Sequence, residues 1–135
     1  DVYGAIIDSQ IDQDIVGQDY IEMSKYLDYI CPMIYPSHYV DGSYGIEHPD
    51  LAPYDLIVAA LNKSKEVLSQ VEEGSHIAIV RPWLQDFTAP WIANYQAYGP
   101  KQIREQIEGV YDAGYDEWIL WNGSNKYTKE GLLQE

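Results

Sequence analysis

Four short apolar runs alternate with three helical patterns along this chain, and that order constrains the fold more than any other feature. The runs are rich in β-branched and aromatic residues and have few polar interruptions, so we expect strands that are buried on both faces. The four runs are Val2–Ile7, Tyr29–Tyr35, Ile77–Leu84 and Trp118–Trp121. Strands separated by helices run parallel and connect through right-handed crossovers, so the sequence predicts an α/β fold with a parallel sheet.

Helix start and stop signals support this alternating order. Asp19 suits an N-cap because its carboxylate can accept a hydrogen bond from a backbone N–H of the next turn, and Glu22 follows three residues later. Proline suits the first helical position, where its missing N–H removes no intrahelical bond, and glycine suits a left-handed C-cap. We therefore expect helices roughly at Tyr20–Leu27, from Pro53 to a stop at Gly74, and from about Pro100 to a cap at Gly114.

The connections between these elements differ in length on the two sides of the predicted sheet. Residues 36–52 and 86–99 form two long connections, and each follows the carboxyl end of a predicted strand. The turn at 114–116, which leads from a helix into a strand, is short. Because α/β folds keep their ligand sites at the carboxyl ends of strands, the long connections indicate the functional face.

The chain is strongly acidic, with 22 Asp and Glu against 8 Lys and Arg and a formal net charge of −14. Such a charge repels phosphate backbones and anionic lipid headgroups, which argues against nucleic acid and membrane surfaces as partners. No apolar run approaches the ~20 residues that a membrane-spanning helix needs. Apolar residues make up 46% of the chain, which is enough to build a core. We therefore expect a folded, soluble chain.

We expect no cofactor and no metal site. Cys31 is the single cysteine, so it can form neither an internal disulfide nor, alone, a zinc site, and its apolar surroundings predict core packing. Asp12 and Asp14 begin a stretch that resembles a calcium-binding loop. Val16 and Met23 then stand where oxygen ligands are required. This acidic stretch is therefore interpreted as a solvated, helix-capping loop.

The ends of the predicted strands carry side chains suited to sugar recognition. Phenol, imidazole and amide groups exchange hydrogen bonds with hydroxyls, and an indole face can stack on the apolar face of a pyranose. The candidate substrate-binding residues are Tyr35, His38, Trp83, Gln85, Trp121 and Asn122. The alternative for Tyr35 is simple packing, and the alternative for His38 is a surface loop bond. Together these side chains favour a carbohydrate as the ligand.

Asp86 is the candidate catalytic residue. It falls at the end of the third predicted strand, with Trp83, Phe87 and Trp91 close in sequence, and aromatic surroundings can tune a carboxyl group for general acid or base work. The alternatives for Asp86 are an ion pair and a loop cap. No glycine-rich phosphate loop and no Ser-His-Asp spacing is visible. Carbohydrate recognition is the chemistry that remains, with acid–base hydrolysis of a glycosidic bond as one option.

Three ordered motifs, 28–39, 81–87 and 116–122, resemble the C-terminal half of a bacterial family of glycoside hydrolase domains. That family belongs to the TIM-barrel glycosidase superfamily, and the resemblance covers essentially the whole chain. It implies that residues 1–135 form a (β/α) half-barrel whose parallel strands correspond to strands five to eight. A complete barrel needs ~250 residues, and the family's strand-four motif with its catalytic Asp has no counterpart here. The resemblance thus implies a fragment whose second carboxylate lies in an absent half.

Three functions stay open at this point. The first is half of a glycoside hydrolase, whose partners would be a polysaccharide and the missing N-terminal half of the barrel, or a second copy of the chain. The second is a non-catalytic carbohydrate-binding module on the same scaffold. The third is a self-contained small α/β domain of unrelated function. An acidic, cysteine-poor chain is compatible with the exterior or the cell envelope of a bacterium, and the sequence leaves the compartment open.

Overall fold

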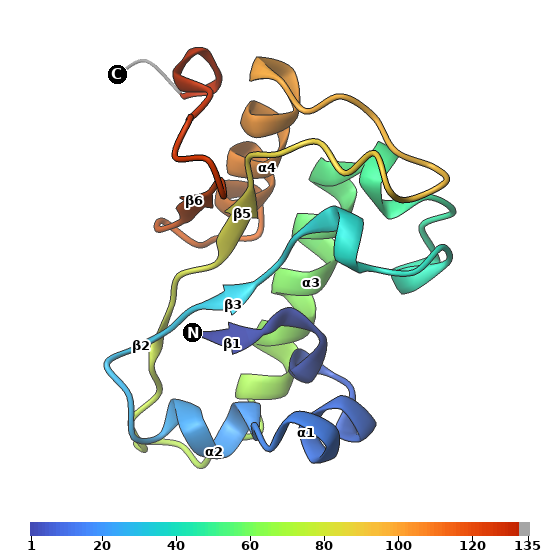
Figure 1. The fold of residues 1–135 in the computed structure, drawn as a ribbon. Coiled ribbons are helices and arrows are strands. Elements are labelled where there is room, and N and C mark those ends of the chain that lie inside the picture. The colour runs from blue at the N-terminus through green and yellow to red at the C-terminus, as the bar shows by residue number, and fades with distance from the viewer. Residues whose placement is uncertain (133–135) are drawn as a thin grey trace.

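The fold, seen in a computed structural model that describes residues 1–132, is built around a four-stranded sheet (Figure 1). The strand order is β1-β3-β5-β6, and every pairing is parallel. A separate two-stranded sheet pairs β2 with β4, also in parallel. The prediction of an α/β fold with parallel strands is confirmed. The strands are β1 (Val2–Tyr3), β2 (Tyr29–Ile30), β3 (Pro32–Met33), β4 (Ile79–Val80), β5 (Trp83–Gln85) and β6 (Ile119–Trp121).

Two of the predicted strands are each divided in two by a proline. The run at 29–35 changes sheets between β2 and β3, where Pro32 follows Cys31, and the run at 77–84 changes sheets between β4 and β5, at Pro82. Proline has no N–H to donate to a sheet, so a continuous ladder is interrupted at such positions. As a result, each of the two runs leaves the β2–β4 pair and continues into the four-stranded sheet. There β3 and β5 are neighbours, and their carboxyl ends lie side by side.

The first predicted strand is shorter than the prediction of Val2–Ile7. It ends at Tyr3, and Gly4–Ile7 forms a 3₁₀ turn instead. Ile6 and Ile7 are fully buried in this turn, so their apolar character serves the core and not a strand. The apolar run therefore predicted burial correctly and strand length wrongly, because periodicity does not separate a short buried strand from a buried turn.

Gly4 is required by the close approach of two other segments. A Cβ atom at this position would lie 2.4 Å from the Met33 carbonyl oxygen and 2.6 Å from the Tyr39 hydroxyl oxygen. We expect Gly4→Ala to lower the free energy of unfolding by about 1–3 kcal/mol, because the backbone at Met33 must move. Urea unfolding measures this change. The control is Ala5→Ser, at an exposed neighbouring position, and equal midpoints for the two variants would contradict the prediction.

The predicted helix starts, and the predicted left-handed glycine after the last helix, agree with the structure. Asp19 caps its helix by accepting a hydrogen bond of 2.8 Å from the Glu22 N–H, and Gly114 has the left-handed φ of 76°. The second helix ends at Leu68, before the predicted stop at Gly74. The acidic stretch expected as a loop contains a further helix, α1, which no sequence pattern predicted because it buries no residue. The helices are α1 (Gln10–Val16), α2 (Tyr20–Ser24), α3 (Pro53–Leu68) and α4 (Pro100–Asp112).

Helices α3 and α4 pack together and cover one face of the four-stranded sheet (Figure 1). Leu84 of β5 is fully buried on that face, against the apolar sides of the two helices. The opposite face is open, because Tyr3 is 54% exposed and Trp121 is 42% exposed. The expectation of burial on both faces is therefore wrong for this sheet. Among the described helices, none combines the length and the apolar character that crossing a bilayer requires.

Candidate functional site

Five aromatic rings gather where β3, β5 and β6 end, and we call them the aromatic cluster. The Phe87 ring is at its centre, with ring centroids 5.7 Å from Tyr35 and 5.4 Å from Trp121, both edge to face. The Tyr35 ring also meets the His38 ring edge to face at 5.1 Å. Trp91 stacks on Phe87 at 6.1 Å. The cluster thus joins residues from three strand ends: Tyr35, His38, Phe87, Trp91 and Trp121.

The two indoles of the cluster face solvent, and the buried phenol of Tyr35 packs against Trp121. Trp91 is 68% exposed and Trp121 is 42% exposed, whereas Tyr35 is only 5% exposed. Burial raises the pKa of Tyr35 to about 12 and lowers the pKa of the partly buried His38 below its ordinary value. Both groups are therefore neutral near pH 7, and the cluster offers an uncharged aromatic surface on which the exposed His38 can form a hydrogen bond.

Gln85 lies beneath the cluster and is fully buried. Its Oε1 accepts hydrogen bonds from the Ser37 N–H at 3.0 Å and the Ser37 hydroxyl at 2.8 Å. Its Nε2 donates to Asp50 Oδ1 at 3.1 Å and to the Phe87 carbonyl at 3.0 Å. With its amide fully used, Gln85 fixes the segments that carry His38 and Phe87. Direct contact between Gln85 and a sugar stays a prediction.

Asp50 is a buried carboxylate that sequence reasoning missed. It is 2% exposed, and its Oδ2 accepts a hydrogen bond of 3.0 Å from the Gln96 N–H. Its backbone carbonyl accepts from Gln96 Nε2 at 2.7 Å and from the Tyr98 hydroxyl at 3.2 Å. Through these hydrogen bonds Asp50 links both long connections, 36–52 and 86–99, to Gln85. No local pattern marks this role, because every partner is distant in the sequence.

Asp86 is buried at 2% exposure and shapes the segment that follows β6. Its Oδ2 accepts a hydrogen bond of 2.8 Å from the Thr128 N–H, and its Oδ1 accepts one of 2.7 Å from the Thr128 hydroxyl. Asn122 donates its amide to the Asp86 carbonyl and accepts from the Ser124 N–H at 2.8 Å. These bonds match the loop-cap alternative for Asp86. A catalytic role for Asp86 and a sugar contact for Asn122 stay predictions.

Trp83 lies on the open face of the sheet, two residues before Gln85 and outside the aromatic cluster. Its neighbours in register are Met33 and Ile119. The indole Nε1 donates a hydrogen bond of 2.8 Å to the Asp1 carboxylate. Trp83 begins β5 and pairs with Ile119, whereas Trp121 ends β6 and pairs with Gln85. The structure therefore does not place the two predicted sugar-binding indoles side by side.

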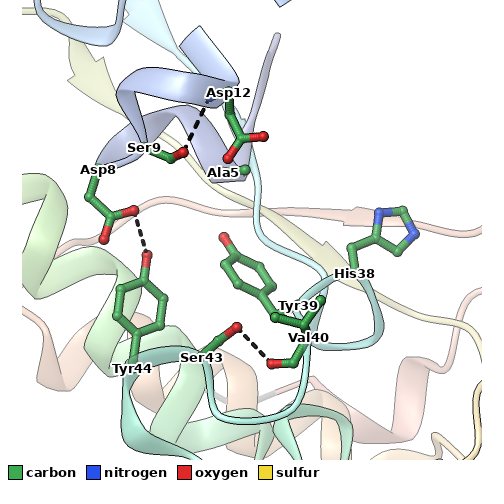
Figure 2. Close-up of a pocket in the computed structure, with 9 residues that line it drawn as sticks. All are labelled: Ala5, Asp8, Ser9, Asp12, His38, Tyr39, Val40, Ser43 and Tyr44. Carbon is green, nitrogen blue, oxygen red and sulfur yellow. Dashed lines mark hydrogen bonds between the residues drawn. The ribbon is translucent and has the colours of Figure 1, made fainter. Parts of the chain in front are cut away.

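A pocket of about 390 Å³ adjoins the aromatic cluster (Figure 2). His38 belongs to both, because its ring contacts Tyr35 and also lines the pocket. Within residues 1–132, no three His, Cys, Asp or Glu side chains are grouped so that they could hold a metal ion. The pocket is lined by Ala5, Asp8, Ser9, Asp12, His38, Tyr39, Val40, Ser43 and Tyr44.

The parallel sheet and the helices that cover one of its faces define an α/β domain, and the exposed indoles and the pocket lie at the strand ends, the edge where such folds usually bind ligands. The chain belongs to the protein family described as "Putative glycosyl hydrolase domain", whose model matches residues 1–127. The resemblance seen in the sequence motifs is thereby confirmed at the level of the family. A comparison with curated proteins finds no match.

Proposed function

We propose that this chain forms the sugar-binding wall of a glycoside hydrolase site. The observation that carries the proposal is the exposed Trp121 indole, held at the end of β6 by edge contacts with Phe87. A rigid indole that is open on one side offers the flat apolar surface on which a pyranose stacks. The family description supports glycosyl hydrolysis as the reaction class, and we propose O-glycosyl bonds in a polysaccharide as the substrate.

The sheet topology supports a half-barrel as the scaffold of this wall. Its strands are all parallel, one face is covered by helices, and β1 and β6 occupy the two edges. In a (β/α)₈ barrel such a sheet continues at both edges and its open face becomes the interior. We propose that the partner at these edges is the N-terminal half of a barrel, or a second copy of the chain, with the present strands as strands five to eight.

Glycoside hydrolysis generally uses two carboxylates, ~5–5.5 Å apart for retention of configuration and ~6.5–9.5 Å apart for inversion. Asp86 is the acid/base group that the sequence favours, but its carboxylate is 2% exposed and is bonded to Thr128. We therefore assign to Asp86 the positioning of the 122–128 segment. The same observation favours one alternative function, a non-catalytic carbohydrate-binding module that keeps the sugar surface and lacks the acid.

Trp121→Ala tests the proposed sugar surface. We expect this variant to bind oligosaccharides at least ~10-fold more weakly, because it loses the stacking face, and a tenfold change corresponds to about 1.4 kcal/mol. Titration calorimetry with a panel of neutral oligosaccharides measures the affinity, and release of reducing ends measures hydrolysis.

The matched control is Tyr26→Ala, which removes an aromatic side chain that is 82% exposed and lies outside the aromatic cluster. Tyr26→Ala should bind as the unaltered chain does. Equal affinities for Trp121→Ala and the unaltered chain would refute the stacking role. Cleavage of any oligosaccharide by the unaltered chain would exclude the non-catalytic alternative.

A further inference from the structure

The pocket next to the aromatic cluster is acidic, and we call it the acidic pocket. One wall comes from the start of α1 and the turn before it, which carry Asp8 and Asp12, and the other wall comes from the segment with Tyr39 and Tyr44 (Figure 2). A pocket of about 390 Å³ lies within the size range of small-ligand sites. His38 lines both surfaces, so the acidic pocket adjoins the aromatic cluster.

The two carboxylates of the acidic pocket are not neutralised by a cation. Asp8 is exposed and accepts a long hydrogen bond of 3.3 Å from the Tyr44 hydroxyl. No Lys or Arg lines the pocket, and the ion pairs found among residues 1–132 involve neither Asp8 nor Asp12. His38 adds no positive charge near neutral pH, since burial lowers its pKa. The pocket therefore carries negative charge within a chain whose net charge is −14.

A second observation, independent of the carboxylates, indicates a ligand here. The Tyr39 hydroxyl oxygen is buried and has no hydrogen-bond partner among the described residues. Figure 2 shows this hydroxyl directed into the space between Asp8 and Asp12. Burial, with Tyr44 and Asp8 nearby, raises the pKa of Tyr39 well above its ordinary value, so the phenol keeps its proton. A buried donor left unpaired is costly, and a ligand hydroxyl would satisfy it.

We propose that the acidic pocket binds a cationic amino sugar, with its ammonium group at Asp8 and a ring hydroxyl on Tyr39, while Asp12 adds to the negative charge of the pocket. A carboxylate attracts an ammonium group, gives a neutral sugar only hydrogen bonds, and repels an acidic sugar. The inference rests on the proposed sugar-binding function and specifies its substrate class. The saccharide on the aromatic cluster would then continue, past His38, into a unit that carries a free amine.

The test compares a glucosamine trimer with an N-acetylglucosamine trimer by titration calorimetry on the whole chain. At about pH 6, below the ordinary pKa of an amine, the glucosamine trimer is cationic and its acetylated counterpart is neutral. We expect the cationic trimer to bind about 5-fold or more tightly, the scale of partly exposed ion pairs. The preference should shrink as NaCl rises from about 20 to about 500 mM, because salt screens such pairs.

Two variants and one control locate the effect. Asp8→Asn should reduce the preference for the cationic trimer toward 1, whereas the control Asp14→Asn, the same charge change on α1 outside the pocket lining, should leave the preference intact. Tyr39→Phe should weaken binding of both trimers a few-fold without lowering the melting temperature, because the deleted hydroxyl has no partner in the protein.

The outcomes separate the two proposals. Equal binding of the two trimers, or an unchanged preference in Asp8→Asn, overturns the amino-sugar inference and leaves the sugar-binding function standing. Binding of neither trimer overturns the inference, and if the neutral oligosaccharide panel also fails, the proposed function fails with it. A lowered melting temperature in Tyr39→Phe would show that the hydroxyl has a structural partner and would remove the second observation.

Discussion

Gln85→Glu is expected to destabilise the protein by about 3–5 kcal/mol at neutral pH, although it changes the side chain by one atom. The introduced oxygen would take the place of Nε2, which donates to Asp50 Oδ1 at 3.1 Å and to the Phe87 carbonyl at 3.0 Å. Both donor bonds would become contacts between acceptors, and two carboxylates would meet in a buried site. Buried groups of like charge are among the largest destabilising changes known.

The loss should depend on pH in a definite direction. Burial and the adjacent Asp50 would raise the pKa of the introduced carboxyl group above its unfolded value of about 4.3. Ionisation is then easier in the unfolded chain, so the destabilisation is small below about pH 4 and grows as pH rises, until the raised pKa is passed. Thermal unfolding from about pH 4 to pH 8 measures this difference between the variant and the unaltered chain.

The control for this series is Gln70→Glu, the same chemical change at an exposed position just after α3. Its melting temperature should follow that of the unaltered chain at every pH. If Gln85→Glu showed no pH-dependent loss relative to this control, the buried amide–carboxylate contact between Gln85 and Asp50 would not exist in solution.

Asp86→Ala is expected to lower the free energy of unfolding by about 2–3 kcal/mol and the melting temperature by roughly 6–15 °C. The variant loses both hydrogen bonds from Thr128, at 2.8 and 2.7 Å, and leaves the Thr128 N–H without its acceptor. Because those bonds hold the segment after β6, sugar binding at Trp121 should weaken as well. Calorimetric melting and the oligosaccharide titration measure the two effects.

Asp86→Asn separates a positioning role from a catalytic one. A hydroxyl can accept as well as donate, so the asparagine amide can donate to Thr128 Oγ1 while its carbonyl accepts from the Thr128 N–H. We expect this variant to keep the fold and the sugar affinity that Asp86→Ala loses. A fall in turnover of ~10²-fold or more in Asp86→Asn, with stability unchanged, would instead identify Asp86 as the general acid or base.

The outline of the fold could be predicted from the sequence because its signals are local. The Asp19 cap, the proline at the start of α3 and the left-handed Gly114 each act within a few residues, and each is found as expected. Parallel pairing followed from the alternation of strand and helix. The shorter first strand could not be foreseen, because an apolar run does not distinguish a short buried strand from a buried turn.

The candidate site was predicted less completely, for the same physical reason. Tyr35, His38 and Trp121 were expected at strand ends, and the structure brings their rings together with Phe87. The hydrogen bonds that occupy the buried Asp86 carboxylate come from Thr128, 42 residues further along the chain. A sequence shows that a carboxylate ends a strand, but only tertiary contacts show whether that carboxylate is open to a ligand.

Pro32 at the start of β3 and Pro82 just before β5 mark where the chain passes from a lower part of the molecule, the base, to the strand ends of the four-stranded sheet, the rim. The base holds the β2–β4 pair, whereas the aromatic cluster belongs to the rim that begins at β3 and β5. Since the two ladders share no strand, a substitution at the half-exposed Ile79 removes no hydrogen bond of the ladder that places Trp121. Polar substitutions that improve solubility can therefore be placed on the β2–β4 pair, away from the residues proposed to bind sugar.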